Sequence, residues 1–245
     1  MTRWMLAATW LLCTPRALAE PTMVELLNAT DDFARGESSK ATLQMQVKTP
    51  RYERTMTMEA YSKGTEKSLI RILSPAKDAG ISTLKVDDNI WNYLPKVDRT
   101  MKVPGAMMSG NWMGSHFTND DLVKSSRLSD DFEGKITTRP SDGPGAVYTV
   151  ELTAKPDAAI VWGQVVVRVN AEMIPVDIRY FEEDGALART MSFSDIKNFD
   201  GQSIPSRMRL QPADDPDSYT EIVYAELKFN VALDDSDFSL QALKR

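Results

Sequence analysis

A period-two alternation of apolar and polar side chains constrains this chain more than any other feature. Leu43, Met45 and Val47 alternate with polar residues, and Met56 and Met58 repeat the pattern one segment later. Such alternation is typical of antiparallel strands with one buried face. Similar short segments follow as far as residue 229, separated by turn residues such as Asp-Asp, Pro and Asp-Gly. Connections this short make neighbouring strands pair as a meander.

The pattern predicts a fold that is mainly β with a few helices. A single sheet of about 11 strands curls, so we expect a strongly curved antiparallel half-barrel with helices covering its concave face. Residues 21–36 are predicted to form a helix, with Thr22 and Glu25 capping its start. A short helix is expected to begin at Thr118, and another is expected over residues 235–243.

The first 19 residues have the features of a cleaved signal peptide. Arg3 precedes an apolar run over residues 4–13, and small residues at 17–19 form a cleavage pattern. We therefore expect export and a single domain over residues 20–245. Removing the segment's two arginines leaves 27 Lys and Arg against 35 Asp and Glu, a net charge of −8. This acidic balance argues against binding to nucleic acid, and no basic cluster suggests binding to an anionic membrane.

Motifs for catalysis and metal binding are missing from the sequence. His116 is the only histidine, Cys13 is the only cysteine, and no nucleophile elbow, phosphate loop or dinucleotide fingerprint is present. Adjacent aspartates such as Asp120 and Asp121 project in different directions on a strand or a helix, and turns and caps explain them better. We therefore expect that the protein is not an enzyme, with no catalytic residue, no metal site and no cofactor.

Residues 104–121 interrupt the strand pattern with a segment rich in methionine. Eleven of the 13 methionines lie beyond residue 19. Methionine is flexible and polarizable, so it lines surfaces that accept apolar groups of variable shape, although it also fills gaps in ordinary cores. The cluster lies among Gly and Ser residues, which favours a mobile lid over an apolar groove. The predicted lid residues are Met107, Met108, Trp112, Met113 and Phe117.

The apolar residues of the first strands are the candidates for the wall of this groove. Trp91 and Tyr93 share one strand face, so either both lie on the wall or neither does. The alternative for every wall residue is the opposite face of the sheet, packed under a helix. The predicted wall residues are Leu43, Met45, Val47, Met56, Met58, Ile70, Ile72, Leu84, Trp91, Tyr93 and Met101.

Two stretches resemble the LolA-like family of outer membrane lipoprotein-sorting proteins. Residues 86–95, VDDNIWNYLP, are similar to the strand–turn–strand core of that family, and residues 112–122, WMGSHFTNDDL, resemble a segment of one of its branches. The resemblance extends over nearly the whole chain after residue 19. It implies a half-closed antiparallel barrel with helices over its mouth, an apolar cavity for acyl chains and no catalytic residues. The chain departs from the family at two places. His116 occupies a position where the family is expected to have an acidic residue. A basic residue followed by proline, which the family's sorting chaperone carries on an early strand, is absent near residues 62–64.

The resemblance implies that residues 20–245 form a single LolA-like lipid-carrier domain. We expect a periplasmic monomer that binds the acyl chains of a lipoprotein or another lipid and shuttles them between the inner and outer membranes. Its expected partners are an inner-membrane transporter or permease and an outer-membrane acceptor, with no nucleic acid. The alternative is a lipid- or protein-binding sensor or adaptor subunit of a membrane transporter or signalling system.

Overall fold

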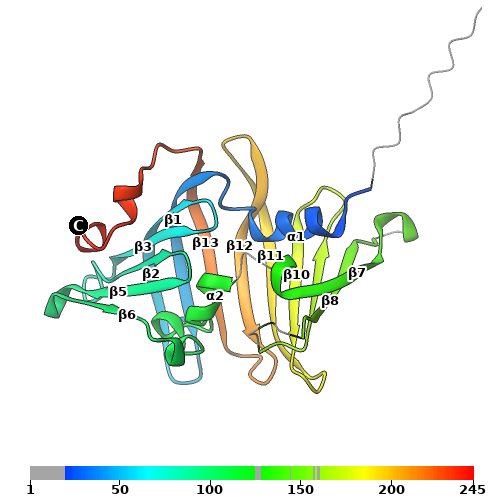
Figure 1. Cartoon of the computed structure of the whole chain (residues 1–245), viewed down its shortest axis with the longest axis horizontal. Coiled ribbons are helices and arrows are strands. Elements are labelled where there is room, and N and C mark those ends of the chain that lie inside the picture. Colours follow the sequence, from blue (N-terminus) through cyan, green and yellow to red (C-terminus); the bar gives the residue numbers. More distant parts are fainter. Residues whose placement is uncertain (1–19, 125–127, 144, 157, 159–160) are drawn as a thin grey trace, which may run out of the picture.

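One open antiparallel sheet dominates the fold. The computed structural model describes residues 20–124, 128–143, 145–156, 158 and 161–245 (Figure 1), so the predicted signal peptide lies outside the described residues. Within these ranges, 13 strands follow the spatial order β6-β5-β4-β3-β2-β1-β13-β12-β11-β10-β9-β8-β7. The edge strands β6 and β7 stand at opposite ends of this order, so the sheet does not close into a barrel. The strands are β1 (Ser38–Lys48), β2 (Glu53–Lys63), β3 (Lys67–Ser74), β4 (Ser82–Val86), β5 (Asn89–Leu94), β6 (Arg99–Lys102), β7 (Phe132–Thr138), β8 (Tyr148–Ala154), β9 (Gln164–Val169), β10 (Pro175–Phe181), β11 (Leu187–Phe199), β12 (Gln202–Pro212) and β13 (Tyr219–Phe229).

The predicted fold class is confirmed as mainly β, but the predicted count of about 11 strands is too low. Two strands near one edge of the sheet are short. β6 has four residues and β4 has five, so neither carries a long alternating pattern of its own. Pairing with β5, which lies between them, supplies their backbone hydrogen bonds.

β1 joins the two halves of the sheet. Met45 of β1 lies opposite Met56 of β2 and opposite Ile222 of β13. Directly opposed residues of antiparallel strands project from the same face, so the three side chains share one face, here called the inner face. All three belong to the main hydrophobic core. The alternation seen in the sequence therefore becomes an apolar surface that is continuous across the centre of the sheet.

Helix α1 (Met23–Asp31) contributes to the same core. Its start is capped as predicted, because Thr22 Oγ1 accepts from the Glu25 N–H and the Glu25 carboxylate accepts from the Thr22 N–H at 2.7 Å. Leu26 and Leu27 are fully buried in the main core. The helix ends earlier than predicted, and a turn leads from it into β1.

Two further helices follow the methionine-rich segment. They are α2 (Asn119–Lys124) and α3 (Leu128–Asp131). α2 begins as predicted, since Thr118 Oγ1 accepts from the Asp121 N–H at 3.1 Å. Figure 1 shows α1 and α2 on the same side of the sheet. Among the described residues, no helix combines the length and apolarity that crossing a membrane requires.

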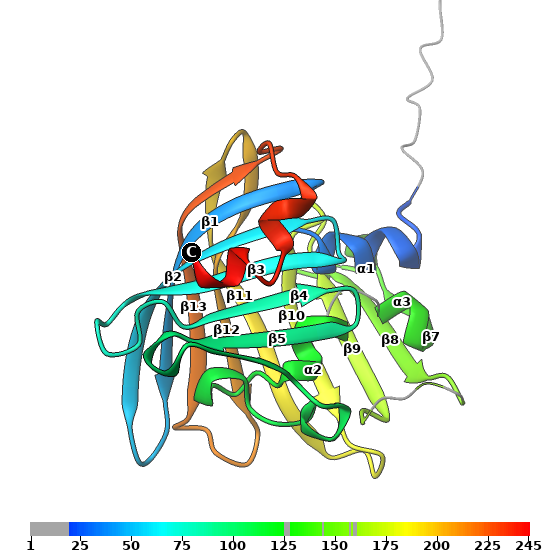
Figure 2. The ribbon, with the colours of Figure 1, turned by 60° about the vertical axis from the view of Figure 1, so that its left-hand side comes forward.

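The C-terminal segment packs on the other face of the sheet, here called the outer face, over β3 and β4 (Figure 2). Two 3-10 helices, Asp235–Phe238 and Ala242–Lys244, replace the single helix predicted over residues 235–243. Ser239 between them has an extended backbone, which interrupts the helix. This segment and the strands beneath it form a second cluster of buried side chains: Leu69, Leu84, Tyr93, Phe238, Ala242 and Leu243.

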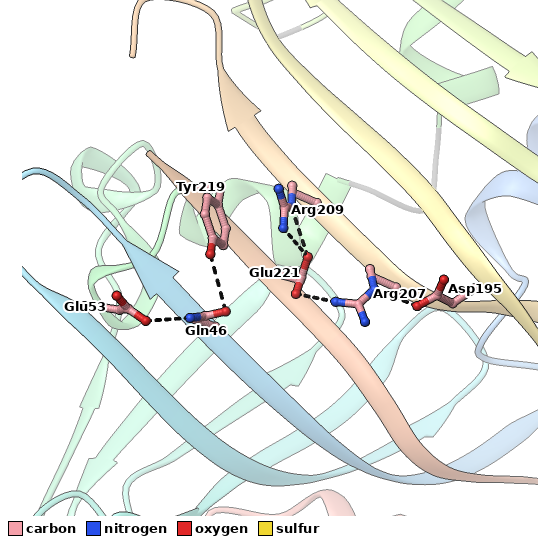
Figure 3. A network of polar contacts seen from close by, with 7 residues as sticks. All are labelled: Gln46, Glu53, Asp195, Arg207, Arg209, Tyr219 and Glu221. Atoms are coloured by element: carbon pink, nitrogen blue, oxygen red, sulfur yellow. Dashed lines mark hydrogen bonds and ion pairs between the residues drawn. The ribbon is translucent and has the colours of Figure 1, made fainter. Parts of the chain in front are cut away.

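The outer face of the central strands is polar. Glu221 of β13 accepts from Arg207 Nη1 at 2.5 Å and from Arg209 Nη2 at 2.7 Å, both on β12 (Figure 3). Arg207 Nε also donates to Asp195 Oδ2 at 2.8 Å. Glu221 immediately precedes Ile222, whose side chain lies on the inner face. In these strands the charged groups therefore project outward and the apolar groups inward.

Candidate binding cavity

A cavity of about 230 Å³ lies between the inner face and the segments that cross it. Residues 30–35, residues 112–122 and strands from both halves of the sheet line it, and most of the lining side chains are apolar. The apolar lining residues are Phe33, Ala34, Ala41, Leu43, Met58, Ala60, Ile70, Trp112, Phe117, Leu122, Ile178, Tyr180, Met191, Phe193, Met208, Ile222 and Tyr224. A mostly apolar hollow with a few polar groups is the usual form of a ligand site.

Residues 104–122, here called the roof segment, hold one indole ring against the cavity. Trp112 is 3% exposed, and its Nε1 donates to Thr83 Oγ1 of β4 at 3.0 Å. Its backbone N–H donates to the Phe117 carbonyl at 2.7 Å, and Ser115 Oγ donates to the Trp112 carbonyl at the same distance. These bonds fix the orientation of the ring because each end of the residue has a partner.

The roof segment is also bonded to β13 and to the turn between β1 and β2. The His116 N–H donates to Thr220 Oγ1 of β13 at 2.9 Å, and the His116 ring Nδ1 lies 2.8 Å from the same oxygen. Burial lowers the pKa of His116, which favours its neutral ring. Tyr52, just before β2, donates its hydroxyl to the Gly114 carbonyl. The segment predicted to be a mobile lid is thus a folded roof tied to the sheet at several points.

Two carboxyl groups line the cavity, and neither is an ordinary exposed acid. Asp121 of α2 pairs with Arg189 of β11. Asp31 lies at the C-terminal end of α1, where burial raises the pKa of its carboxyl to about 8 and Arg35 only partly offsets the effect. The Asp31 carboxyl is therefore mainly neutral at pH 7. Within the described residues, no group of three or more His, Cys, Asp or Glu side chains could hold a metal ion.

Three of the predicted wall residues line the cavity: Leu43, Met58 and Ile70. Others lie beside them in the main core, fully or almost fully buried, without reaching the hollow. These are Met45, Val47, Met56 and Ile72.

The structure does not bring Leu84, Trp91 and Tyr93 to the cavity. Leu84 and Trp91 oppose each other on the outer face, and all three pack in the second cluster under the C-terminal segment. Trp91 and Tyr93 share a face as predicted, and it is the outer one. Their neighbours Thr83 and Asn92 occupy the inner face, with Thr83 Oγ1 donating to Asn92 Oδ1 at 2.7 Å. Of these two inward-facing residues, Thr83 accepts the hydrogen bond from the roof's indole.

Apart from Met58, the methionines predicted for this site lie around the cavity rather than in its lining. Met107 is 60% exposed, and Met108 is half-buried. Met113 is half-buried against the main core, and Met101 is on the inner face of β6, outside the lining. The predicted lid residues that do line the cavity are Trp112 and Phe117.

The second half of the chain supplies wall residues that the sequence analysis did not name. They are Ile178, Tyr180, Met191, Phe193, Met208, Ile222 and Tyr224. Alternation along β10 to β13 was the signal that could have found them. The pairing of β1 with β13, which places Tyr224 opposite Leu43, is not visible in any local pattern.

The sequence matches a family model over residues 64–245, and the description of that family reads "Uncharacterized protein". No protein of curated function matches the chain. The chain resembles three solved structures closely in fold.

The first is a domain described as an outer membrane lipoprotein-sorting protein, from Vibrio parahaemolyticus, with 23% identity, a TM-score of 0.72 and coverage of 90% of this chain and 98% of that one. A LolA superfamily protein from Nitrosomonas europaea has 20% identity and a TM-score of 0.73, with coverage of 91% and 100%. A DUF1329 family protein from Desulfovibrio piger has 22% identity and a TM-score of 0.75, with coverage of 92% and 100%. At these identities the likeness is one of fold, and it confirms the resemblance at that level.

Proposed function

Because this chain belongs to the family whose model spans residues 64–245, and has the fold of the LolA superfamily, we propose that it is a periplasmic carrier of acyl chains. In this proposal it binds the acyl chains of a lipoprotein or another lipid in the cavity and shuttles them between the inner and outer membranes. Helices α1 and α2 and the roof segment cover the concave inner face and shield the bound chain from water.

The observation that carries the proposal is the apolar cavity under Trp112 and Phe117. A cavity of about 150 Å³ holds one benzene molecule, so 230 Å³ holds about nine carbon atoms on the same scale. That size fits a segment of an acyl chain. Burying nine methylenes stabilises a complex by roughly 7 kcal/mol, at about 0.8 kcal/mol for each.

The cavity is smaller than a complete membrane acyl chain. A chain of about 15 methylenes is worth roughly 12 kcal/mol when fully buried, so the rest of the chain either lies outside or displaces the roof. Incomplete burial suits a carrier, since a carrier that held its cargo far more tightly than the acceptor membrane would not release it. In this proposal the carrier is a monomer that receives its cargo from an inner-membrane transporter or permease and gives it to an outer-membrane acceptor.

Lipid extraction and transfer test the proposal in two steps. Protein purified without detergent is extracted with organic solvent, and the extract is analysed by mass spectrometry; we expect an acyl lipid in a defined molar ratio. The delipidated protein is then mixed with donor vesicles carrying a labelled acyl lipid and with unlabelled acceptor vesicles, and transfer is expected to rise with protein concentration. Bound lipid without transfer would favour the sensor or adaptor, and absence of both would overturn the proposal.

A further inference from the structure

The lining of the cavity changes from apolar to polar along the strands. Moving toward the α1–β1 turn, the inner-face row that contains Leu43 and Met58 is followed by a row that contains Ala41, Ala60 and Ile70. The next row comes from four adjacent strands, and all of its members line the cavity. This row, here called the polar row, consists of Ser39, Ser62, Ser68 and Lys85.

Lys85 brings a buried positive charge to the polar row. Its side chain is 4% exposed, and it is the only buried lysine among the residues whose burial is described. Its Nζ donates to the Thr65 carbonyl in the turn between β2 and β3. In the same row, the hydroxyls of Ser39 and Ser62 are 2.7 Å apart. An ammonium group beside several hydroxyls at one end of an apolar cavity offers donors to the polar head of a bound molecule, and its positive charge favours an anionic head over a neutral one.

One more cation, Arg35 in the turn between α1 and β1, lines the same end of the cavity. The α1–β1 turn meets the β2–β3 turn at this end of the cavity, since the Gly64 N–H donates to the Glu37 carbonyl at 2.8 Å. Lys67, which begins β3, also borders this end, but its side chain projects to the outer face, where its Nζ pairs with Asp235 at 2.8 Å. The lining acids contribute little opposing charge, because Asp121 is paired with Arg189 and burial raises the pKa of Asp31.

We propose that the ligand is an amphiphile with an anionic head, a carboxylate or a phosphate, which lies at the polar row beside Lys85 while its chain enters the apolar part of the cavity. The inference rests on the proposed carrier function and narrows its cargo to one class. The serine hydroxyls donate to the head, and the Lys85 ammonium supplies a charge-assisted hydrogen bond. The chain then passes the row of Ala41, Ala60 and Ile70, where the two small alanine side chains leave room for it, toward Leu43 and Met58.

Calorimetric titration with four probes on delipidated full-length protein tests the proposal. Decanoate and decyl phosphate have an anionic head, decanol has a neutral head on the same chain, and inorganic phosphate has no chain. We expect the two anionic amphiphiles to bind about tenfold more tightly than decanol, and inorganic phosphate to bind much more weakly than decyl phosphate.

Lys85→Gln should lower the affinity of the two anionic amphiphiles to that of decanol and leave the affinity for decanol unchanged. The matched control is Lys228→Gln, an exposed lysine on the outer face of β13, which should change none of the affinities.

The comparison of decanol with the two anionic amphiphiles uses the wild-type protein alone. It therefore tests the preference for an anionic head even if Lys85→Gln does not fold. Equal affinity for decanol and decanoate would overturn the anionic-head inference and leave the carrier proposal standing. Inorganic phosphate binding as tightly as decyl phosphate would also overturn it, because the site would then recognise an anion without a chain. Failure of all three decyl probes to bind would overturn the proposed function itself.

Discussion

Arg189 of β11 holds Asp121 of α2 through two parallel hydrogen bonds, Nη1 to Oδ2 at 2.9 Å and Nη2 to Oδ1 at 2.6 Å. The two side chains are only 8% and 16% exposed. The guanidinium also lies over the rings of Trp162 and Tyr180, 4.6 and 4.4 Å from their centroids. A bidentate, largely desolvated pair of this kind is among the stronger polar contacts in proteins. It fastens the end of the roof segment to the half of the sheet that lies across the cavity.

Breaking this pair should loosen the roof. Asp121→Asn and Arg189→Met should each lower the free energy of unfolding by roughly 3 kcal/mol, because each leaves a buried partner uncompensated. The double variant should lose less than the sum of the two, and urea titration of all four proteins measures this coupling. Release of bound decanoate should be faster in both single variants. Strictly additive losses would show that the pair does not act as a unit.

Filling the cavity should reduce binding without harming the fold. Ala60 lines the hollow on β2, and Ala60→Leu places a larger side chain in the path of the ligand. We expect decanol affinity to fall about tenfold while the free energy of unfolding is unchanged or higher, since new apolar contacts form in the void. Ala213→Leu, at an exposed position after β12, is the matched control. Unchanged affinity in Ala60→Leu would mean that the chain binds elsewhere.

The second cluster should matter for stability and not for binding. Leu243, in the C-terminal segment, is fully buried against the outer face of the sheet, so Leu243→Ala should lower the free energy of unfolding by roughly 2–5 kcal/mol. Decanoate affinity should stay within about twofold at a temperature where the variant is folded. Leu240→Ala, three residues earlier and 49% exposed, should change stability by less than about 0.5 kcal/mol. A marked loss of affinity in Leu243→Ala would connect Leu84, Trp91 and Tyr93 to the ligand after all.

The buried carboxyl of Asp31 should make binding depend on pH. Its pKa is raised from 3.8 to about 8, so the folded protein binds more protons than the unfolded chain between these values. The stability that this group contributes is therefore complete below about pH 4 and is lost as the pH rises through 8. A neutral probe isolates the effect on binding: decanol affinity should be constant from about pH 6 to 7 and fall above pH 8, when the carboxylate charges in an apolar cavity.

Asp31→Asn is the control for this dependence, because it keeps the shape and removes the titration. Calorimetry on both proteins should show a decrease in decanol affinity above pH 8 for the wild type alone. The same decrease in both proteins would assign the titration to another group.

Much of the local structure follows from residues close together in the chain. The reciprocal bonds of Thr22 and Glu25 begin α1 where the sequence places them, and Thr118 begins α2. The alternation through Met45 and Met56 predicts two strands whose apolar residues oppose each other. These features depend on backbone hydrogen bonding and side-chain spacing within a few residues, so a linear pattern contains them.

The candidate site was only partly predictable, as the strands β3 to β5 show. Both faces of these strands are covered, one by the roof segment and the other by the C-terminal segment. Alternation separates Trp91 from Asn92, and it does not say which of the two faces the cavity. The inward-facing Thr83 accepts a hydrogen bond from Trp112, a partner 29 residues away in the sequence.

By itself, the sequence determined the period of each element, the caps, the turns and the apolar character of the roof, since these depend on neighbours in the chain. The tertiary structure alone decided which strand faces meet around the cavity, because that depends on partners brought together from distant segments. The pairing of Leu43 with Tyr224 and of Asp121 with Arg189 exists only once the sheet has formed, and these contacts define the hollow and hold its roof.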